Sequence, residues 1–264
     1  MYKCSLILLL ILFFSMTIQA WARVDVPEGW SVERTRHFLV YYKNVPYDLV
    51  KTVQESAEEC FRTIKENLGM SSEVPWTLDD RAKIYIYPNH DDYVAALKGF
   101  PWSSGVAHAK DKTIRTFPAE NGFFDSVLPH ELGHIIFREV IGFETEIPLW
   151  LEEGVAMNQE KAKRYGSDQY VKEAIKNKRF KTLAQLSQMQ LTHEISKTEV
   201  DLFYEESASA VNFLINEYED VRFFRLCKKL KEGFSFEPVL EKVYPQVRSI
   251  KRLNDNWVDY LERK

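Results

Sequence analysis

The chain has 264 residues, of which 45% are hydrophobic and 28% charged, a composition typical of soluble globular proteins. The formal net charge is −4 and the sequence contains no long basic block, so binding to nucleic acid through its phosphates is not expected. The length is that of one large domain or two small ones.

The first 22 residues differ from the rest of the chain. Lys3 supplies one positive charge, an unbroken apolar run follows at Leu6–Phe14, and small residues stand at Ala20 and Ala22. This order predicts a signal peptide at 1–22, cleaved after Ala22 or after Ala20. The apolar run is shorter than the ~20 residues that span a bilayer, so an uncleaved N-terminal anchor is the less favoured alternative. We therefore expect an exported protein, periplasmic or extracellular, without a stable membrane span.

Cleavage would remove Cys4 and leave Cys60 and Cys227, each within a segment of helical periodicity. An exported compartment permits a disulfide between them, and two separate buried thiols are an equal alternative. The sequence contains no Cys-x-x-Cys pair, so a thiolate zinc site has no support.

The first part of the mature chain, residues 23–122, mixes expected strands and helices. Aromatic and β-branched residues indicate the strands, and apolar residues at helical spacing indicate the helices. In chain order these are strand His37–Tyr42, helix Pro46–Leu68, strand Ala82–Tyr87, helix Asp91–Lys98, and one or two strands within Gly105–Thr116.

The second part, residues 123–264, is expected to be helical. The predicted helices are approximately Phe123–Val140, Leu149–Tyr165, Glu199–Tyr218, Val221–Lys231, Glu237–Val243 and Ile250–Glu262. Helices that follow strands favour an α+β fold. We expect a small N-terminal mixed sheet with helices, followed by a mostly α-helical C-terminal region.

The predicted helix at Phe123–Val140 contains the sequence His-Glu-Leu-Gly-His, from His130 to His134. Two histidines four positions apart lie on one face of a helix, about one turn from each other, so both imidazoles can bind one zinc ion. Glu131 then lies beside the metal, where it can accept a proton from the attacking water.

The surroundings of this motif favour a metal site over two unrelated surface histidines. An apolar segment leads into it, and Ile135, Ile136 and Phe137 follow it, so the helix should be buried on much of its circumference. Buried histidine and glutamate side chains without partners are unfavourable, and a bound metal removes that penalty.

A catalytic zinc needs a third protein ligand and an open fourth position. The next predicted helix offers Glu152 and Glu153, and Glu153 lies 19 residues after His134. Together these motifs resemble the gluzincin metallopeptidases, in the thermolysin-like and aminopeptidase branch of the peptidase MA superfamily. In that branch a glutamate followed by glycine, at this spacing, completes the site. The resemblance implies Glu153 as the third zinc ligand and leaves Glu152 as a carboxylate that is solvated or supports a ligand.

The resemblance covers about residues 35–262 and implies a stand-alone peptidase MA-like catalytic domain at 23–264, with the zinc site between its two parts. In the family a tyrosine on a later helix can reach the site, and Tyr204 holds the matching place. Its phenol would donate to the oxyanion of the tetrahedral intermediate. A core tyrosine with a satisfied hydroxyl is an equal alternative.

Of two further histidines, His193 has only a minor candidate role and the side chain of His108 is incidental. His193 is a less favoured second oxyanion donor. His108 belongs to a segment that reads as an edge strand, and in related peptidases the backbone of such a strand binds extended substrate.

These residues predict a zinc-dependent peptidase with Glu131 as the general base, Zn²⁺ as the cofactor and a peptide or protein as the substrate. Nothing in the sequence specifies an oligomeric state. One alternative is a zinc amidase acting on a non-peptide or cell-wall amide. Another is a metal-bearing envelope protein that binds peptides without cleaving them, although a pure binder has no need of Glu131.

Overall fold

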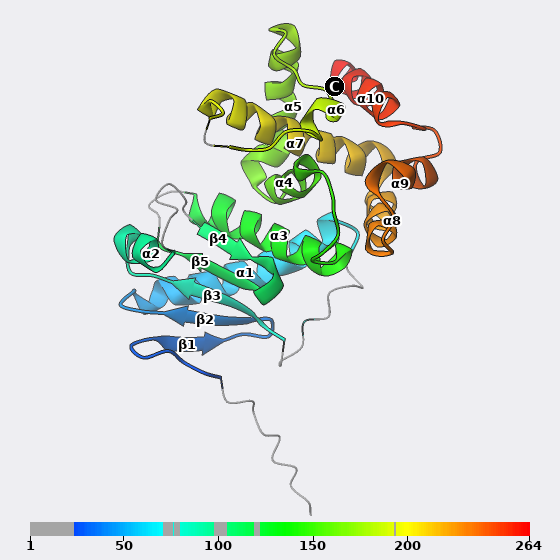
Figure 1. Ribbon diagram of the computed structural model, residues 1–264. Helices are drawn as coiled ribbons and strands as arrows, with labels where there is room; N and C mark the ends of the chain where they lie inside the picture. The colour runs from blue at the N-terminus through cyan, green and yellow to red at the C-terminus, as the bar shows by residue number, and fades with distance from the viewer. Residues whose placement is uncertain (1–23, 71–75, 77–79, 98–104, 119–121, 193) are drawn as a thin grey trace, which may run out of the picture.

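The computed structural model describes residues 24–70, 76, 80–97, 105–118, 122–192 and 194–264. The α+β fold class is confirmed: a five-stranded mixed sheet near the N-terminus precedes a mostly helical region (Figure 1). The expected signal peptide at 1–22 lies outside the described residues. Among the helices of the described ranges, none has the length and apolar character needed to cross a membrane.

The sheet has mixed strand directions. Its strands, in spatial order, are β1 (Ser31–Arg34), β2 (Phe38–Tyr42), β3 (Ala82–Ile86), β5 (Thr113–Thr116) and β4 (Gly105–His108). Strands β2, β3 and β5 are parallel, whereas the edge strands β1 and β4 run antiparallel to their neighbours. The strands predicted from the sequence are all observed. The sequence pattern does not indicate β1, because its residues Ser-Val-Glu-Arg include only one apolar side chain.

Two helices pack together beside the sheet. Helix α1 (Tyr47–Asn67) contacts β2, helix α3 (Leu128–Ile141) contacts β4, and the two helices contact each other. Alternate residues of β3, namely Ala82, Ile84 and Ile86, are buried in the same core as the apolar faces of these helices. Helix α2 (His90–Leu97) and the 3-10 turn η1 (Ala109–Asp111) complete this part of the chain.

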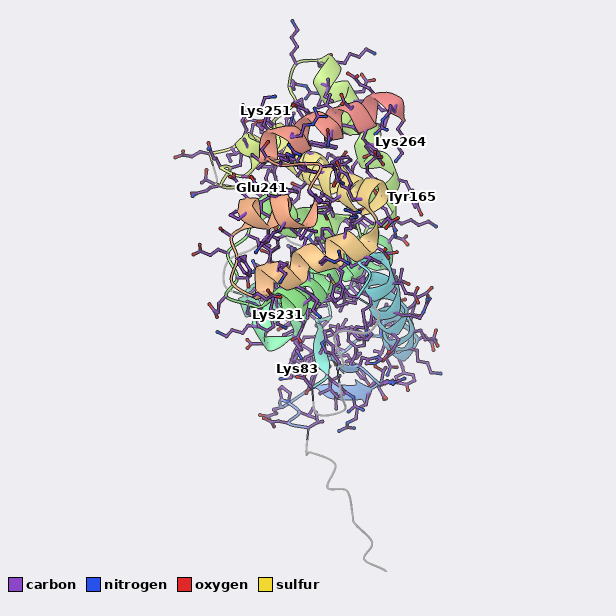
Figure 2. The ribbon with its side chains drawn as sticks, turned by 90° about the vertical axis from the view of Figure 1, so that its right-hand side faces the viewer. Lys83, Tyr165, Lys231, Glu241, Lys251 and Lys264 are labelled. Atoms are coloured by element: carbon purple, nitrogen blue, oxygen red, sulfur yellow. The ribbon has the colours of Figure 1, made fainter. Side chains whose placement is uncertain are left out.

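The C-terminal region is built around one long helix. Its elements are α4 (Leu149–Met157), α5 (Lys161–Lys176), α6 (Leu183–Leu186), α7 (Lys197–Tyr218), α8 (Asp220–Lys231), α9 (Phe236–Val243) and α10 (Ile250–Arg263). Helix α7 contacts α4, α5, α8 and α10. Figure 2 shows the resulting elongated shape, with Lys83 of the sheet near one end and Lys251 and Lys264 near the other.

The prediction of one helix over Leu149–Tyr165 was wrong, because the chain forms two helices there. Helix α4 ends at Met157 and α5 begins at Lys161. The Asn158 amide donates to the carbonyl oxygens of Gly154 (3.1 Å) and Ala208 (2.7 Å). A side chain that bonds to nearby backbone in this way competes with continuation of the helix.

The predicted helix at Phe123–Val140 begins with a different local structure. Residues Phe123–Val127 form a π-helical turn, η2, and the α-helix α3 follows directly from Leu128. Such turns are rare and frequently occur at functional sites. Here the turn sets the position of Ser126, which contacts the candidate site described below.

The two cysteines of the described chain are separate thiols. Cys60 on α1 is partly exposed and Cys227 on α8 is buried. Burial raises the pKa of Cys60 to about 11, with further contributions from the nearby Glu59 and Asp125 carboxylates. Burial raises the pKa of the Cys227 thiol too, so both thiols stay protonated near neutral pH.

Helix α4 is held closely between α3 and α7. A Cβ atom added to Gly154 of α4 would lie 2.3 Å from the Ser207 carbonyl oxygen of α7. A Cβ on Gly133 of α3 would lie 3.1 Å from the Ala156 Cα of α4. Since no larger residue fits at Gly154 without a shift of backbone, the absence of a side chain there permits the close contact of α4 with α7.

Candidate metal centre

Helix α3 places His130 and His134 side by side. The two residues are one turn apart on the same face, and their Nε2 atoms are 3.2 Å from each other. Most of each side chain is buried, with 19% of His130 and 17% of His134 exposed. Both Nε2 atoms therefore point to a common position in a partly enclosed site.

Helix α4 brings Glu153 to the same position. Its Oε2 atom lies 3.8 Å from His130 Nε2 and 3.6 Å from His134 Nε2. The potential ligand atoms of these three residues all lie within 4.8 Å of one another. The chain turns between the two helices at Gly142, whose φ of 94° favours glycine.

The geometry of the three donors fits a zinc ion. Ligand atoms at about 2.0–2.1 Å from a tetrahedral metal are separated by roughly 3.3–3.4 Å, close to the three separations found here. Without a cation the arrangement is electrostatically unfavourable. Burial, followed by the charges of His130 and Arg138, lowers the pKa of His134 to about 3. Burial also raises the pKa of Glu153 to about 7, against the opposing charge of His130.

Glu131 is half-buried beside these residues and faces the edge strand β4. Burial raises the pKa of its carboxyl group, while the charge of His130 and a hydrogen bond from the Ala107 backbone N–H oppose that rise. The Cβ position of Gly105 lies 3.6 Å from Glu131 Cγ and 2.5 Å from a Val127 methyl carbon. Strand β4 therefore contacts Glu131 closely, and a side chain at Gly105 would displace these residues.

Sequence reasoning missed two residues that support His130. Glu160 Oε1 lies 2.8 Å from His130 Nδ1, and the Ser126 hydroxyl donates to the other oxygen of Glu160. Burial is the largest influence and lowers the pKa of His130, but the hydrogen bond with Glu160 and the charges of the nearby carboxylates together outweigh it, so that the net shift is upward. A carboxylate that accepts the second N–H of a metal-binding imidazole fixes its tautomer and orientation.

Glu152 and Glu153 occupy different surroundings. The structure brings Glu153 to the imidazole Nε2 atoms, whereas Glu152 is paired with the guanidinium of Arg138. Glu152 Oε1 lies 3.9 Å from Nδ1 of His134. Glu152 therefore supports the site from its outer side rather than facing solvent.

Tyr204 lies on α7 next to the site. It lines a hollow of about 510 Å³ together with His130 and Glu160. Burial raises the pKa of the Tyr204 phenol to about 12, and the nearby Glu153 and Glu131 carboxylates add to the rise. The phenol is therefore a proton-bearing donor at neutral pH.

The other histidines are apart from this cluster. His108 is the last residue of β4, where its side chain is exposed. His193, considered as a second oxyanion donor, lies outside the described residues.

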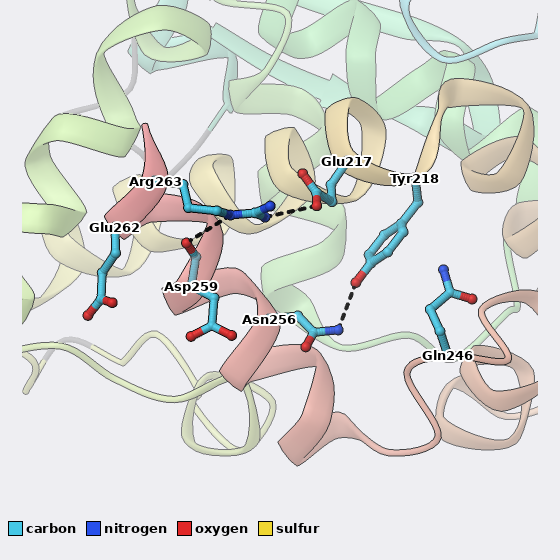
Figure 3. A pocket seen from close by; sticks show the side chains of 7 residues that line it. All are labelled: Glu217, Tyr218, Gln246, Asn256, Asp259, Glu262 and Arg263. Carbon is cyan, nitrogen blue, oxygen red and sulfur yellow. Dashed lines mark hydrogen bonds and ion pairs between the residues drawn. The ribbon is translucent and has the colours of Figure 1, made fainter.

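A second hollow, of about 600 Å³, lies between the C-terminal end of α7 and helix α10 (Figure 3). Two pairs of its lining side chains bond to each other. Arg263 pairs with Glu217 at 2.9 Å, and the Asn256 amide donates to the Tyr218 hydroxyl at 3.0 Å. Among the described residues, no group of three or more potential metal ligands lies here, in contrast to the centre at α3 and α4.

The α+β fold, the paired histidines on one helix and the glutamate on the next define a gluzincin-like metal centre. The family comparison agrees: residues 64–263 match the model of the peptidase MA superfamily, so the chain belongs to this superfamily. A search of the curated proteins found no match.

Two solved structures resemble the chain at 15% sequence identity. The M1 zinc metallopeptidase from Deinococcus radiodurans aligns with a TM-score of 0.51 over 89% of this chain and 50% of its own. A mutant of that enzyme aligns over the same shares with a TM-score of 0.49. The chain thus spans about half the length of these structures, and the likeness to the first of them shows a shared fold.

Proposed function

We propose that the chain is a zinc-dependent peptidase in which His130, His134 and Glu153 bind the metal and Glu131 is the general base. The observation that carries this proposal is the triangle of partly buried donor atoms from His130, His134 and Glu153, with the separate carboxylate of Glu131 beside it. Membership of the peptidase MA superfamily supports a zinc peptidase in general. The roles of individual residues are our own inference from the geometry.

A zinc ion at this centre would polarise the scissile carbonyl and lower the pKa of a water molecule. Glu131 accepts a proton from the attacking water and delivers it to the nitrogen of the leaving amine as the C–N bond breaks. The N–H of Ala107 bonds to the Glu131 carboxylate and holds it in place. The Tyr204 phenol donates a hydrogen bond to the oxyanion that forms at the carbonyl oxygen.

We propose a peptide or protein as the substrate. Strand β4 lies at one edge of the described sheet, and it contacts Glu131 through Gly105 and Ala107. An extended peptide that adds to such an edge gains backbone hydrogen bonds without a requirement for particular side chains. The peptidase named among the similar structures is consistent with this substrate class.

Metal analysis and a peptide-cleavage profile test the proposal together. The purified mature protein should contain about one zinc per chain, and His130→Ala or His134→Ala should lose it. A mixed peptide library should be cleaved, cleavage should stop with a chelator, and added zinc should restore it. Stoichiometric zinc retained in both variants would rule out the centre.

The same assays separate the two alternatives. Zinc binding with no cleavage of any peptide would favour a peptide-binding envelope protein. Hydrolysis restricted to non-peptide or cell-wall amides would favour an amidase on the same site.

Export is proposed from the sequence alone. The mature N-terminus is expected at Trp21 or Arg23, which N-terminal sequencing of the protein from its native host would determine. Recovery of the full-length chain only in detergent extracts would favour the uncleaved anchor instead.

A further inference from the structure

Arg138 and Glu152 link the two helices that carry the proposed ligands. Arg138 Nε donates to Glu152 Oε1 at 2.7 Å, and a terminal guanidinium nitrogen donates to Glu152 Oε2. The pair is largely buried, with 16% and 19% of the side chains exposed. Such two-point contact fixes both the distance and the rotation of one group against the other.

The guanidinium of Arg138 also makes a third contact, with the segment that connects α3 to α4. The remaining terminal nitrogen of Arg138 donates to the carbonyl oxygen of Thr145 at 2.8 Å. The Thr145 hydroxyl in turn donates to the Ile141 carbonyl at the end of α3, at 2.5 Å. One side chain of α3 therefore holds both the connecting segment and the first turn of α4.

Each member of the pair adjoins a proposed ligand. Arg138 is one turn after His134 on α3, and Glu152 immediately precedes Glu153 on α4. Glu152 Oε1 lies 3.9 Å from His134 Nδ1, on the opposite side of the ring from Glu153. No direct carboxylate contact of the kind that Glu160 makes with His130 is found for His134 among the described residues.

We propose that Arg138 and Glu152 form a positioning pair that holds His134 and Glu153 in their metal-binding arrangement. The proposal rests on the metal centre of the proposed function. Arg138 occupies both oxygens of Glu152, so this carboxylate stays on the outer side of the His134 ring. Glu153 is then left as the glutamate of α4 that faces the Nε2 atoms.

Charge supports the same role. Four carboxylates lie around the two imidazoles, from Glu131, Glu152, Glu153 and Glu160. The guanidinium of Arg138 neutralises one of them. Without it, Glu152 would be an unpaired buried charge free to move toward a cation, and the donor geometry would change.

Zinc affinity is the measurement that tests the pair. We would titrate metal-free Arg138→Gln, Glu152→Gln and the double variant with zinc against a competing chelator. Each single variant should bind zinc about 10–100-fold more weakly than wild type, the range typical of residues that orient metal ligands. The double variant should be no weaker than the weaker single variant, because both act through one contact.

Glu139→Gln is the matched control. Glu139 follows Arg138 on α3 and forms an ion pair with Lys112 at 3.1 Å. This pair is of similar burial, with 19% of the Glu139 side chain and 11% of the Lys112 side chain exposed. This variant should lower the melting temperature of the metal-free protein without weakening zinc binding. Visible absorption of the cobalt-substituted protein should change in Arg138→Gln and stay as in wild type in Glu139→Gln.

Arg138→Lys keeps the test decisive if Arg138→Gln does not fold. Its ammonium retains the charge but cannot engage both oxygens of Glu152 in the same fork geometry, so zinc affinity should still fall. Wild-type zinc affinity in a folded Arg138 variant, or equal losses in the Arg138 and Glu139 variants, would overturn the proposal. A wild-type protein that binds zinc but cleaves nothing would contradict the proposed function and leave this inference standing.

Discussion

Helix α7 borders two hollows of similar size at its two ends. The first, of about 510 Å³, is lined by His130 and Tyr204 near the metal centre, and the second, of about 600 Å³, by Tyr218 and Arg263. Size alone would favour the second as a binding site. The chemistry of the lining groups points to the first.

The two hollows differ in how their charges are compensated. At the second, Glu217 and Arg263 neutralise each other, and the hydroxyl of Tyr218 has a partner. Beside the first, burial holds the pKa of His134 near 3 and that of Glu153 near 7. Buried titratable groups that lack compensation mark a functional site more reliably than volume does.

The largest expected effect is a loss of peptide hydrolysis, from a substitution at the metal-centre end of α7 and not from one at the other end. Glu131→Gln should lower peptide hydrolysis about 10²–10⁴-fold, because an amide cannot accept the proton of the attacking water. Zinc content should stay the same, since Glu131 is not one of the three proposed ligands. Glu217→Gln, at the second hollow, should hydrolyse peptides at the wild-type rate. Near wild-type cleavage by Glu131→Gln would refute the proposed mechanism, whatever the metal content.

Two tyrosines of α7 give a matched pair. Tyr204→Phe should lower kcat about 10²–10³-fold with little change in KM, since its contact strengthens only as the oxyanion forms. Tyr218→Phe should leave both constants unchanged. Steady-state kinetics on one peptide substrate would compare them, and equal kcat values for the two variants would identify Tyr204 as a core tyrosine.

Two glycines, one in a tight helix contact and one in open space, should differ in their effect on the free energy of unfolding. Gly154→Ala should destabilise the protein by about 3 kcal/mol or more, because its Cβ would lie 2.3 Å from the Ser207 carbonyl oxygen. Gly166→Ala on α5 has no atom within 4 Å of its new Cβ and should stabilise the helix by about 0.5–1 kcal/mol. Chemical denaturation of both variants would show whether α4 and α7 are as tightly packed as described.

The smallest expected effect concerns Glu206, which lies on α7 between the two hollows. One of its oxygens accepts from the Lys181 backbone N–H at 2.7 Å, and the other is buried without a partner in the described structure. Burial raises the pKa of Glu206 to about 7, from 4.5. The folded state therefore retains a proton that the unfolded state releases, and this contribution to stability is lost as pH rises from 4.5 through 7.

Glu206→Gln should remove this dependence. The variant should match wild type near pH 4 and be about 1–3 kcal/mol more stable near pH 8, where the wild-type carboxylate must be charged while buried. Melting temperatures across this range would measure the difference. Parallel profiles for the variant and wild type would mean that Glu206 does not titrate in this window.

The sequence predicts what depends on local spacing. Four-residue spacing places His130 and His134 on one helix face, and resemblance to a family points to Glu153. The partners Glu160 and Arg138 could not be found in this way. Glu160 lies in the turn after α4, and its contact with His130 joins segments that are 30 residues apart in the chain. Contacts between distant segments decide such positions, and they leave no periodic signal.

The three proposed ligands lie within 24 consecutive residues, whereas α7, which packs on α4, begins 44 residues after Glu153. Closing a short loop costs little conformational entropy. A zinc ion can therefore bind the three ligands before α7 packs on α4. Zinc should then increase the refolding rate, since its contacts form before the transition state, whereas the contacts between α4 and α7 should mainly slow unfolding. The metal would then help to nucleate folding, in addition to its part in the proposed reaction. It would also stabilise the native state by less than its affinity implies, because the unfolded chain binds it too.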